Sequence, residues 1–144
     1  MITIQRRIAR AGFSLMEIMI AVTILGLVMA MVAPALQNTL KKGKIRTAKS
    51  SLKGFQHGIE EYQMEVGQLP QTLKDLIKMP RDEKAKKKWE GPYLKKTDEI
   101  QEDPWSENFV YKLTPGSKHP YELYSRGPNR ADAPKEEWIS VWDE

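Results

Sequence analysis

The stretch that decides the fold is FSLMEIMIAVTILGLVMAMVAPAL, residues 13–36 of a chain of 144 residues. Its 24 residues carry a single charged side chain, that of Glu17. A helix of this length extends about 36 Å at 1.5 Å per residue, and the hydrocarbon core of a bilayer is about 30 Å thick. The sequence therefore predicts a helix that crosses a membrane once.

Three arginines precede this apolar stretch, without any acidic residue among them: Arg6, Arg7 and Arg10. Positive charge beside a membrane-spanning helix keeps that end in the cytoplasm, so we expect everything after Leu36 to lie outside it. A cleaved secretory signal is the rival interpretation, but its apolar region should be shorter, uncharged and followed by a small-residue cleavage site. The leader also holds most of the formal net charge of +4, so the pI of 9.2 says little about the folded part.

An acidic side chain inside the apolar stretch needs a physical reason. An ionised carboxylate within the bilayer costs roughly 3 kcal/mol or more. One interpretation is that Glu17 is protonated or reaches the interface from its place near the cytoplasmic end. The other is that cleavage between Gly12 and Phe13 creates an α-ammonium group four residues before Glu17. This new charge would neutralise the carboxylate in the same subunit or in a neighbouring one.

The basic leader, the Gly12-Phe13 junction, Glu17 and the long apolar helix together resemble the class III signal of type IV pilins and type II secretion pseudopilins. The resemblance implies that a prepilin peptidase removes residues 1–12 and N-methylates Phe13. It also implies assembly roles for Glu17 and for Pro34, which matches a proline late in the apolar helix of that family. Since proline lacks a backbone N–H, we expect the helix to kink or to melt locally there.

A second helical pattern continues beyond the membrane, over residues 37–66. Gly67 and Pro70 follow it and provide a stop signal. The pattern fits either a coiled coil or the spine of a globular domain, and we favour the spine because Gly54 and Gly58 weaken a free-standing coil. Its apolar residues recur at spacings of three and four: Ile45, Ala48, Leu52, Phe55, Ile59, Tyr62 and Val66.

Basic side chains without any acid mark the start of this spine: Lys41, Lys42, Lys44, Arg46, Lys49 and Lys53. The first interpretation is a solvated face whose lysines lie near anionic lipid headgroups. The second is electrostatic pairing with Glu60, Glu61 and Glu65 of a neighbouring copy displaced along the helix axis. The third is DNA binding, which ranks last because no aromatic residue interleaves with the lysines.

The chain after residue 66 is polar and rich in turns. A capping-box pattern at Thr72 and Asp75 predicts a second helix over residues 73–78. The charged stretch 81–88 is either a surface loop or the end of a helix. Alternating apolar residues predict three strands within about residues 109–142: FVYKL (109–113), YELYS (121–125) and WISVW (138–142).

These elements predict an α+β, pilin-like fold. A long N-terminal helix, whose first half spans the membrane, packs on a small three-stranded antiparallel sheet. We expect a leader at residues 1–12, a transmembrane helix half at 13–36 and a periplasmic domain at 37–144. The expected core residues are Phe55, Ile59, Tyr62, Phe109, Tyr111 and Leu123.

Short segments of the C-terminal half resemble the major pseudopilins of type II secretion, the general secretion pathway protein G family: EGPYL (90–94), DPWS (103–106), FVY (109–111), YELYS (121–125) and GPN (127–129). The resemblance covers almost the whole chain. It implies a structural subunit of a pseudopilus that is anchored in the bacterial inner membrane and helps to export folded proteins from the periplasm. The implied partners are further copies of the chain, the prepilin peptidase, minor pseudopilins, an inner-membrane assembly platform and membrane lipid, without nucleic acid.

Two alternatives stay open. A type IV pilin shares the N-terminal signal but usually carries a C-terminal disulfide loop, and this chain has no cysteine. A membrane-tethered binding module, for example for DNA uptake, would use the basic residues 41–53 but would need neither the Gly12-Phe13 junction nor Glu17. We do not expect an enzyme, because the sequence has no phosphate-binding glycine loop or nucleophile elbow. His57 falls next to the apolar stripe of the helix and His119 in a turn, so we expect neither to act as a base or a metal ligand.

The resemblance further implies a calcium site in the loop after YELYS. Calcium takes 6–8 oxygen ligands. Three features depart from the family: Asn129 replaces an Asp, Arg130 adds a positive charge, and residues 131–134 do not reproduce the family's spacing. The alternative is a loop held by hydrogen bonds and by the packing of Trp138 and Trp142. The candidate calcium ligands are the Leu123 carbonyl, Ser125, Asn129, Asp132, Glu136 and Glu137.

Overall fold

The computed structural model describes residues 12–94 and 99–143. These residues divide into two compact units, the chain up to Leu40 and the chain from Lys41 onward. Of the predicted leader, residues 1–12, only Gly12 lies within the described residues.

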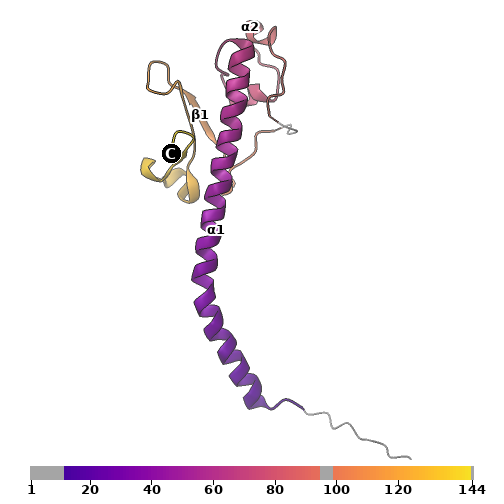
Figure 1. Ribbon diagram of the computed structural model, residues 1–144, viewed down its shortest axis with the longest axis vertical. Coiled ribbons are helices and arrows are strands. Elements are labelled where there is room, and N and C mark those ends of the chain that lie inside the picture. Colours follow the sequence, from indigo (N-terminus) through magenta and orange to yellow (C-terminus); the bar gives the residue numbers. More distant parts are fainter. Residues whose placement is uncertain (1–11, 95–98, 144) are drawn as a thin grey trace, which may run out of the picture. The chain divides into compact units, whose positions relative to one another are not determined.

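One helix, α1 (Leu15–Val66), contains both the apolar stretch and the amphipathic one (Figure 1). Its first turn is capped by Ser14, whose hydroxyl accepts a hydrogen bond of 3.1 Å from the Glu17 N–H. It ends before Gly67, whose φ of 82° is a left-handed conformation that glycine adopts at little cost. The chain is helical at Pro34 as well, so of the two effects expected of this proline, a kink or local melting, the melting does not occur. A proline removes one backbone donor, and the hydrogen bonds around it maintain the helix.

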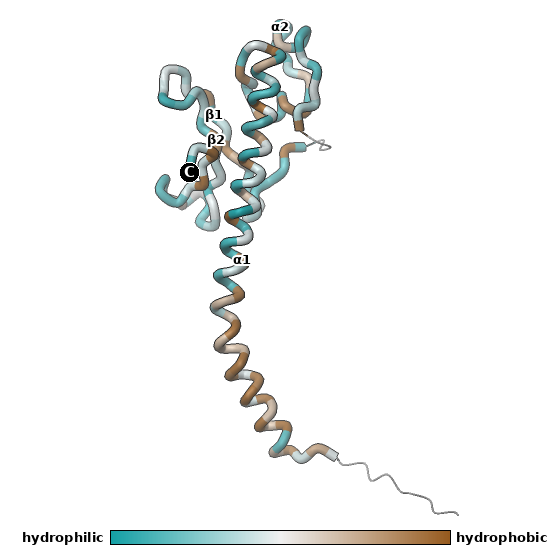
Figure 2. The backbone as a smooth tube through the Cα atoms, in the orientation of Figure 1, coloured by the Kyte–Doolittle hydropathy of each residue, from teal (hydrophilic) through white to brown (hydrophobic). Residues whose placement is uncertain are grey.

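The first unit exposes apolar side chains along the whole of α1 that it contains. Figure 2 shows this as an almost unbroken hydrophobic stretch over the first half of the helix. Among the described residues, α1 is the one helix that is long and apolar enough to cross a membrane. A soluble monomer rarely exposes so large an apolar surface, so lipid or other chains must cover it.

The second unit contains an antiparallel sheet of three strands in the order β1-β2-β3. The first two strands, β1 (Val110–Leu113) and β2 (Tyr121–Ser125), confirm the prediction closely. The third, β3 (Ile139–Ser140), is shorter than predicted. The chain turns away after Ser140, where its N–H donates a hydrogen bond of 2.7 Å to Oδ2 of Asp143.

The core of this unit lies between the sheet and the apolar stripe of α1, beside which β1 runs in Figure 1. The rings of Phe55 and Phe109 meet edge to face with their centroids 5.1 Å apart, a favourable aromatic geometry. Tyr111 is half-buried, and Ile45 packs against the rim of the core. The buried core residues include Ala48, Leu52, Phe55, Ile59, Tyr62, Val66, Phe109, Tyr121, Leu123 and Ile139. The predicted α+β fold is therefore confirmed.

The predicted helix 73–78 is a shorter 3₁₀ helix, η1 (Leu73–Leu76). The Thr72 N–H donates a hydrogen bond of 2.9 Å to Oδ2 of Asp75, which confirms the start of the element. Pro80 lies close behind, and a proline disfavours helical conformation in the residue before it, so the helix cannot extend far. Two further 3₁₀ helices, η2 (Gly127–Asp132) and η3 (Lys135–Glu137), fill the connection between β2 and β3.

The charged stretch 81–88 contains one turn of helix, α2 (Glu83–Lys86). Asp82 caps it, because its Oδ2 accepts a hydrogen bond of 2.8 Å from the Ala85 N–H. Ala85 is buried while the charged side chains around it are exposed. The stretch is thus a short surface helix that packs on the domain through the buried Ala85.

Candidate functional site

The predicted cleavage junction lies immediately before α1. Gly12 and Phe13 are outside the helix and exposed, and 76% of the Phe13 surface is accessible. Proteolytic enzymes act on exposed, non-helical segments. The local structure at this junction is therefore compatible with cleavage between the two residues.

Glu17 lies in the first turn of α1, and its side chain is exposed. The N-terminal end of a helix carries a partial positive charge, which favours an acidic side chain there. Four residues in a helix make about one turn, so a charged amine on Phe13 would lie within one turn of the carboxylate. This arrangement can pair the two groups within one subunit, or leave the carboxylate free for the amine of a neighbour.

Four of the six basic residues singled out on α1 form a narrow exposed face in the second unit, and Lys41 and Lys44 lie outside it. At 100° per residue, Lys42, Arg46, Lys49 and Lys53 lie within about 60° of each other around the helix axis. The buried stripe, which includes Leu52, lies about 130° away from the centre of this face. These four side chains are named the basic face below. They point away from the core, so their charges are available to partners.

The three acidic residues further along α1 differ in their surroundings. Glu65 is occupied, because its Oε2 accepts a hydrogen bond of 2.6 Å from the Tyr93 hydroxyl. Burial and this hydrogen bond raise the pKa of Tyr93 to about 12. Glu60 is close enough to Tyr121 to help raise the pKa of that buried hydroxyl, after burial itself. Glu61 is half-buried, and its Oε1 lies 3.5 Å from Nε2 of His57 on the surface, where it can also meet a basic group of another copy.

The predicted calcium loop follows β2, and its first two candidate ligands are fully buried. The carbonyl oxygen of Leu123 accepts a hydrogen bond of 2.9 Å from the Val141 N–H. The hydroxyl of Ser125 accepts from the Gly127 N–H at 3.1 Å and donates to Oδ2 of Asp103 at 2.5 Å. Both oxygens already have protein partners.

The remaining candidate ligands are exposed. The Asn129 amide donates a hydrogen bond to Oε2 of Glu137, so these two side chains satisfy each other. Asp132 and Glu136 do not join them in a cage: across residues 12–94 and 99–143, no three Asp, Glu or His side chains come close enough to hold a metal ion. As arranged in this chain, the six residues do not fit a calcium ion.

Asp103 is the residue of this region that the sequence did not single out. Its side chain is 4% exposed, and Oδ1 accepts hydrogen bonds of 2.9 Å from the N–H groups of Trp105 and Glu107. The segment DPWS was noted as a motif, but only the fold brings its carboxylate to Ser125.

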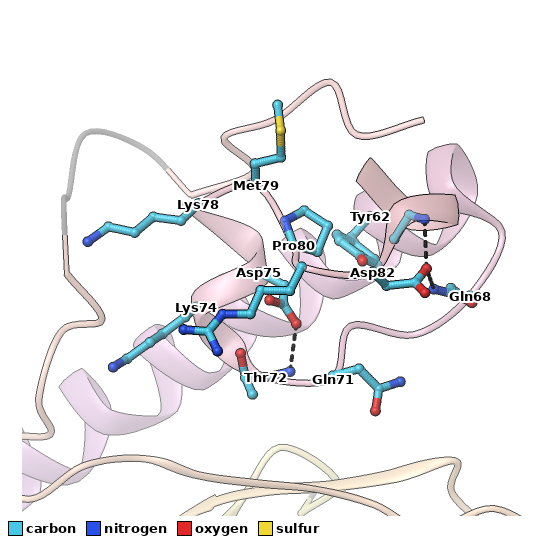
Figure 3. A pocket seen from close by; sticks show the side chains of 12 residues that line it. Tyr62, Gln68, Gln71, Thr72, Lys74, Asp75, Lys78, Met79, Pro80 and Asp82 are labelled. Atoms are coloured by element: carbon cyan, nitrogen blue, oxygen red, sulfur yellow. Dashed lines mark hydrogen bonds between the residues drawn. The ribbon is translucent and has the colours of Figure 1, made fainter. Parts of the chain in front are cut away.

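A hollow of about 500 Å³ lies between α1, η1 and α2 (Figure 3). Two carboxylates line it, but each serves a structural purpose. Asp75 accepts from the Thr72 N–H, and Asp82 accepts from the Ala85 N–H and, at 3.4 Å, from the Gln68 amide. Both carboxylates therefore cap the starts of short helices, and they do not form a catalytic arrangement.

The two histidines also have structural surroundings. His57 lies on the exposed side of α1 beside Glu61. The His119 ring stacks on Trp142 with centroids 4.1 Å apart and an interplanar angle of 15°. Neither geometry resembles a general base aligned with a nucleophile.

Comparison with known proteins gives concordant results for both parts of the chain. Residues 35–142 match the family described as "Type II secretion system (T2SS), protein G". Residues 7–33 match the "Prokaryotic N-terminal methylation motif".

Similar proteins share most of their length with this chain. The type II secretion system core protein G of Pseudomonas aeruginosa is 36% identical over 127 residues, which cover 85% of this chain and 86% of that protein. The protein of the same name from Xanthomonas campestris pv. campestris is 33% identical over 121 residues, which cover 84% and 80%. The crystal structure of the major pseudopilin from the type 2 secretion system of enterohaemorrhagic Escherichia coli has the same fold, with a TM-score of 0.61 at 20% identity. That match covers 74% of this chain and 89% of the other.

Proposed function

The chain belongs to the family of type II secretion system protein G, and from this premise we propose that its copies polymerise into an inner-membrane-anchored pseudopilus that helps to export folded proteins from the periplasm. As a member of this family it is a core pseudopilin, a structural protein rather than an enzyme. One observation carries the proposal: residues 35–142 match protein G directly behind an N-terminal methylation motif at residues 7–33. No observation favours the type IV pilin or the DNA-binding module.

The proposed topology has the N-terminus in the cytoplasm and the domain from residue 37 in the periplasm. The exposed apolar surface of α1 supports a membrane-anchored state before assembly. The arginines of the leader support the orientation. In this topology the Gly12-Phe13 junction lies at the cytoplasmic surface, where a membrane-bound prepilin peptidase can reach it.

Processing prepares the subunit for assembly in the proposed mechanism. Removal of residues 1–12 takes away the three arginines, whose charge would otherwise hold the helix end at the membrane surface. It also creates the α-ammonium of Phe13, later methylated, which can neutralise Glu17. A subunit whose two charges are paired can leave the bilayer and pack its apolar helix against those of its neighbours.

Contacts between subunits are proposed to include the basic face of α1. Lipid headgroups meet its start, but Lys53 lies about 16 Å further along the helix than Lys42. This separation exceeds the screening length of about 8 Å at physiological ionic strength, so a lipid surface beside Lys42 has little attraction for Lys53. Another protein surface is the better partner for that end of the face.

The complementary surface is proposed to be Glu61 of a second copy. Glu61 lies eight residues, or about 12 Å, beyond Lys53 and about a quarter turn round the helix from the centre of the basic face. A contact between two different faces of identical subunits, combined with an axial displacement, generates an open helical filament. Charge complementarity of this kind sets register more than it adds affinity.

The further proposed partners are the minor pseudopilins, the inner-membrane assembly platform and the prepilin peptidase. Their support is the family membership and the methylation motif.

Intact-mass analysis tests the proposal. The full chain would be expressed in two bacterial hosts, one with and one without a prepilin peptidase. In the first host we expect loss of residues 1–12 and one added methyl group, and in the second the full-length mass. An uncut chain in both hosts would contradict the proposed processing, and absence of filaments from a correctly processed chain would contradict the proposed assembly.

A further inference from the structure

We propose that the loop between β2 and β3 is closed by protein groups in place of a metal ion, so that this domain folds and assembles equally well with and without calcium. The proposal concerns residues 127–137 and the two residues that anchor them, Asp103 and Ser125. It departs from the calcium site that the family resemblance implies. Its basis is the set of protein partners that four of the six candidate ligands already have: Leu123, Ser125, Asn129 and Glu137.

The first anchor is the hydrogen bond between Ser125 and Asp103. The Ser125 hydroxyl donates at 2.5 Å to Oδ2, while Oδ1 accepts from two backbone N–H groups of the Asp103 turn. Hydrogen bonds that end on a carboxylate are about twice as strong as neutral ones. The same hydroxyl accepts from the Gly127 N–H, so it also fixes the first residue of the loop. A cation at Ser125 would have to displace these contacts from a fully buried site.

The second anchor joins β2 to the end of the chain. The Leu123 carbonyl accepts from the Val141 N–H at 2.9 Å, which continues the pairing of β2 with β3. Using this oxygen as a metal ligand would compete with that hydrogen bond. The strand pairing thus engages a carbonyl oxygen that the calcium prediction required.

Charge balance in the loop also disfavours a divalent cation. Three basic residues, Arg126, Arg130 and Lys135, stand against three acidic ones within residues 126–137. Arg130 lies inside the connection, and its Nε is 4.0 Å from Oε1 of Glu107. Calcium sites are tuned by the net negative charge of their ligands, and this loop has no such excess.

An aromatic stack closes the far side of the loop. The rings of Tyr124 and Trp138 lie face to face, with centroids 4.2 Å apart and an interplanar angle of 3°. The Trp138 Nε1–H donates to the Ala133 carbonyl at 3.0 Å, and the Lys135 ammonium lies 5.8 Å from the centre of the Trp138 ring. These contacts hold both 3₁₀ helices against β2 without any exposed carboxylate.

The first test measures thermal unfolding of the full chain in detergent, with calcium and with chelator. We expect melting temperatures that agree within about 1 °C, because no binding free energy is linked to folding. Calorimetric titration with calcium should show no saturable heat. A melting temperature that falls by about 5 °C or more in chelator would overturn the proposal.

Variants of the first anchor provide a second, independent test. Asp103→Asn and Ser125→Ala should each lower the melting temperature by about 5–10 °C, equally with and without calcium. Glu122→Gln, which changes an exposed acid three residues before Ser125 on β2, is the matched control and should have no effect. Unchanged melting of Ser125→Ala would contradict the anchoring role even if Asp103→Asn does not fold.

A third variant tests whether one substitution can make the melting temperature depend on calcium. Asn129→Asp replaces an amide that donates to Glu137 with a second carboxylate at the same place. Repulsion between the like charges should lower the melting temperature by a few degrees in chelator, and calcium should restore it. A parent chain that gains as much from calcium as this variant does would overturn the proposal.

Discussion

The hydroxyl of Ser125, at the end of β2, donates a hydrogen bond of 2.5 Å to the carboxylate of Asp103, and both residues are buried. The two lie 22 positions apart in the chain. The bond connects the turn before β1 to the loop after β2, so the two ends of the first hairpin are held from one point.

Glu17→Ala should block filament assembly while the chain still inserts into the membrane. The variant leaves the new α-ammonium without a partner, and an unpaired charge in the bilayer costs about 3 kcal/mol, or a hundredfold in an equilibrium constant. Filament yield would be measured by shearing and immunoblotting, and insertion by membrane fractionation. Thr23→Val, at an exposed polar position six residues further along α1, is the control. Normal filaments from Glu17→Ala would refute the proposed pairing.

Reversal of charge should test the proposed contact along α1. Lys53→Glu and Glu61→Lys are each expected to reduce filament yield about tenfold, because like charges then meet in the assembled state. The double variant should recover most of the yield, since it restores an opposite pair. Lys112→Glu, an exposed residue on β1, serves as control. Equal loss in the double variant and in both single ones would show that these residues do not meet.

Two glycines of α1 should respond to alanine in opposite ways. A Cβ at Gly54 would meet nothing within 4 Å, so Gly54→Ala should stabilise the domain by about 0.5–1 kcal/mol through helix propensity. A Cβ at Gly58 would lie 3.0 Å from Cδ2 of Leu94 and 3.3 Å from the Tyr93 carbonyl oxygen. Gly58→Ala should therefore destabilise it by about 1–2 kcal/mol. Denaturant unfolding of both variants checks the sign, and a stabilised Gly58→Ala would contradict the close packing.

Alkaline pH should destabilise the fold through its buried tyrosines. Burial, and then the negative charge of Glu60, raise the pKa of Tyr121 to about 12, whereas an unfolded tyrosine titrates near pH 10. As the pH rises, Tyr121 loses its hydroxyl proton in the unfolded chain before it does so in the folded one. Its contribution to the free energy of unfolding is therefore complete below about pH 10 and is lost as the pH rises towards 12.

Tyr121→Phe provides the matching measurement. Between pH 8 and pH 11 the free energy of unfolding should fall by about 1 kcal/mol less in this variant than in the parent chain. The measurement is urea unfolding at the two pH values. The same pH dependence in both proteins would show that Tyr121 does not carry this effect.

The sequence by itself determined the features that depend on neighbouring positions. The apolar stretch from Phe13 to Leu36, the stripe that ends at Val66 and the alternation in YELYS each report a local period, and a local period corresponds directly to helix or strand. The structure confirms these elements to within a few residues. The shorter η1 and β3 differ because a nearby proline and a turn at Asp143 end them, which periodicity does not register.

Only the tertiary structure decided which side chains, distant in the sequence, form hydrogen bonds with one another. It joins Glu65 to Tyr93 and Asp103 to Ser125, and these hydrogen bonds give partners to side chains that the sequence alone left open for other contacts. The donor–acceptor distance of a hydrogen bond tolerates deviations of only a few tenths of an ångström, and the groups joined here lie 22 or 28 residues apart. Such distances are set by the packing of α1 on the sheet, and no pattern within a single segment contains them.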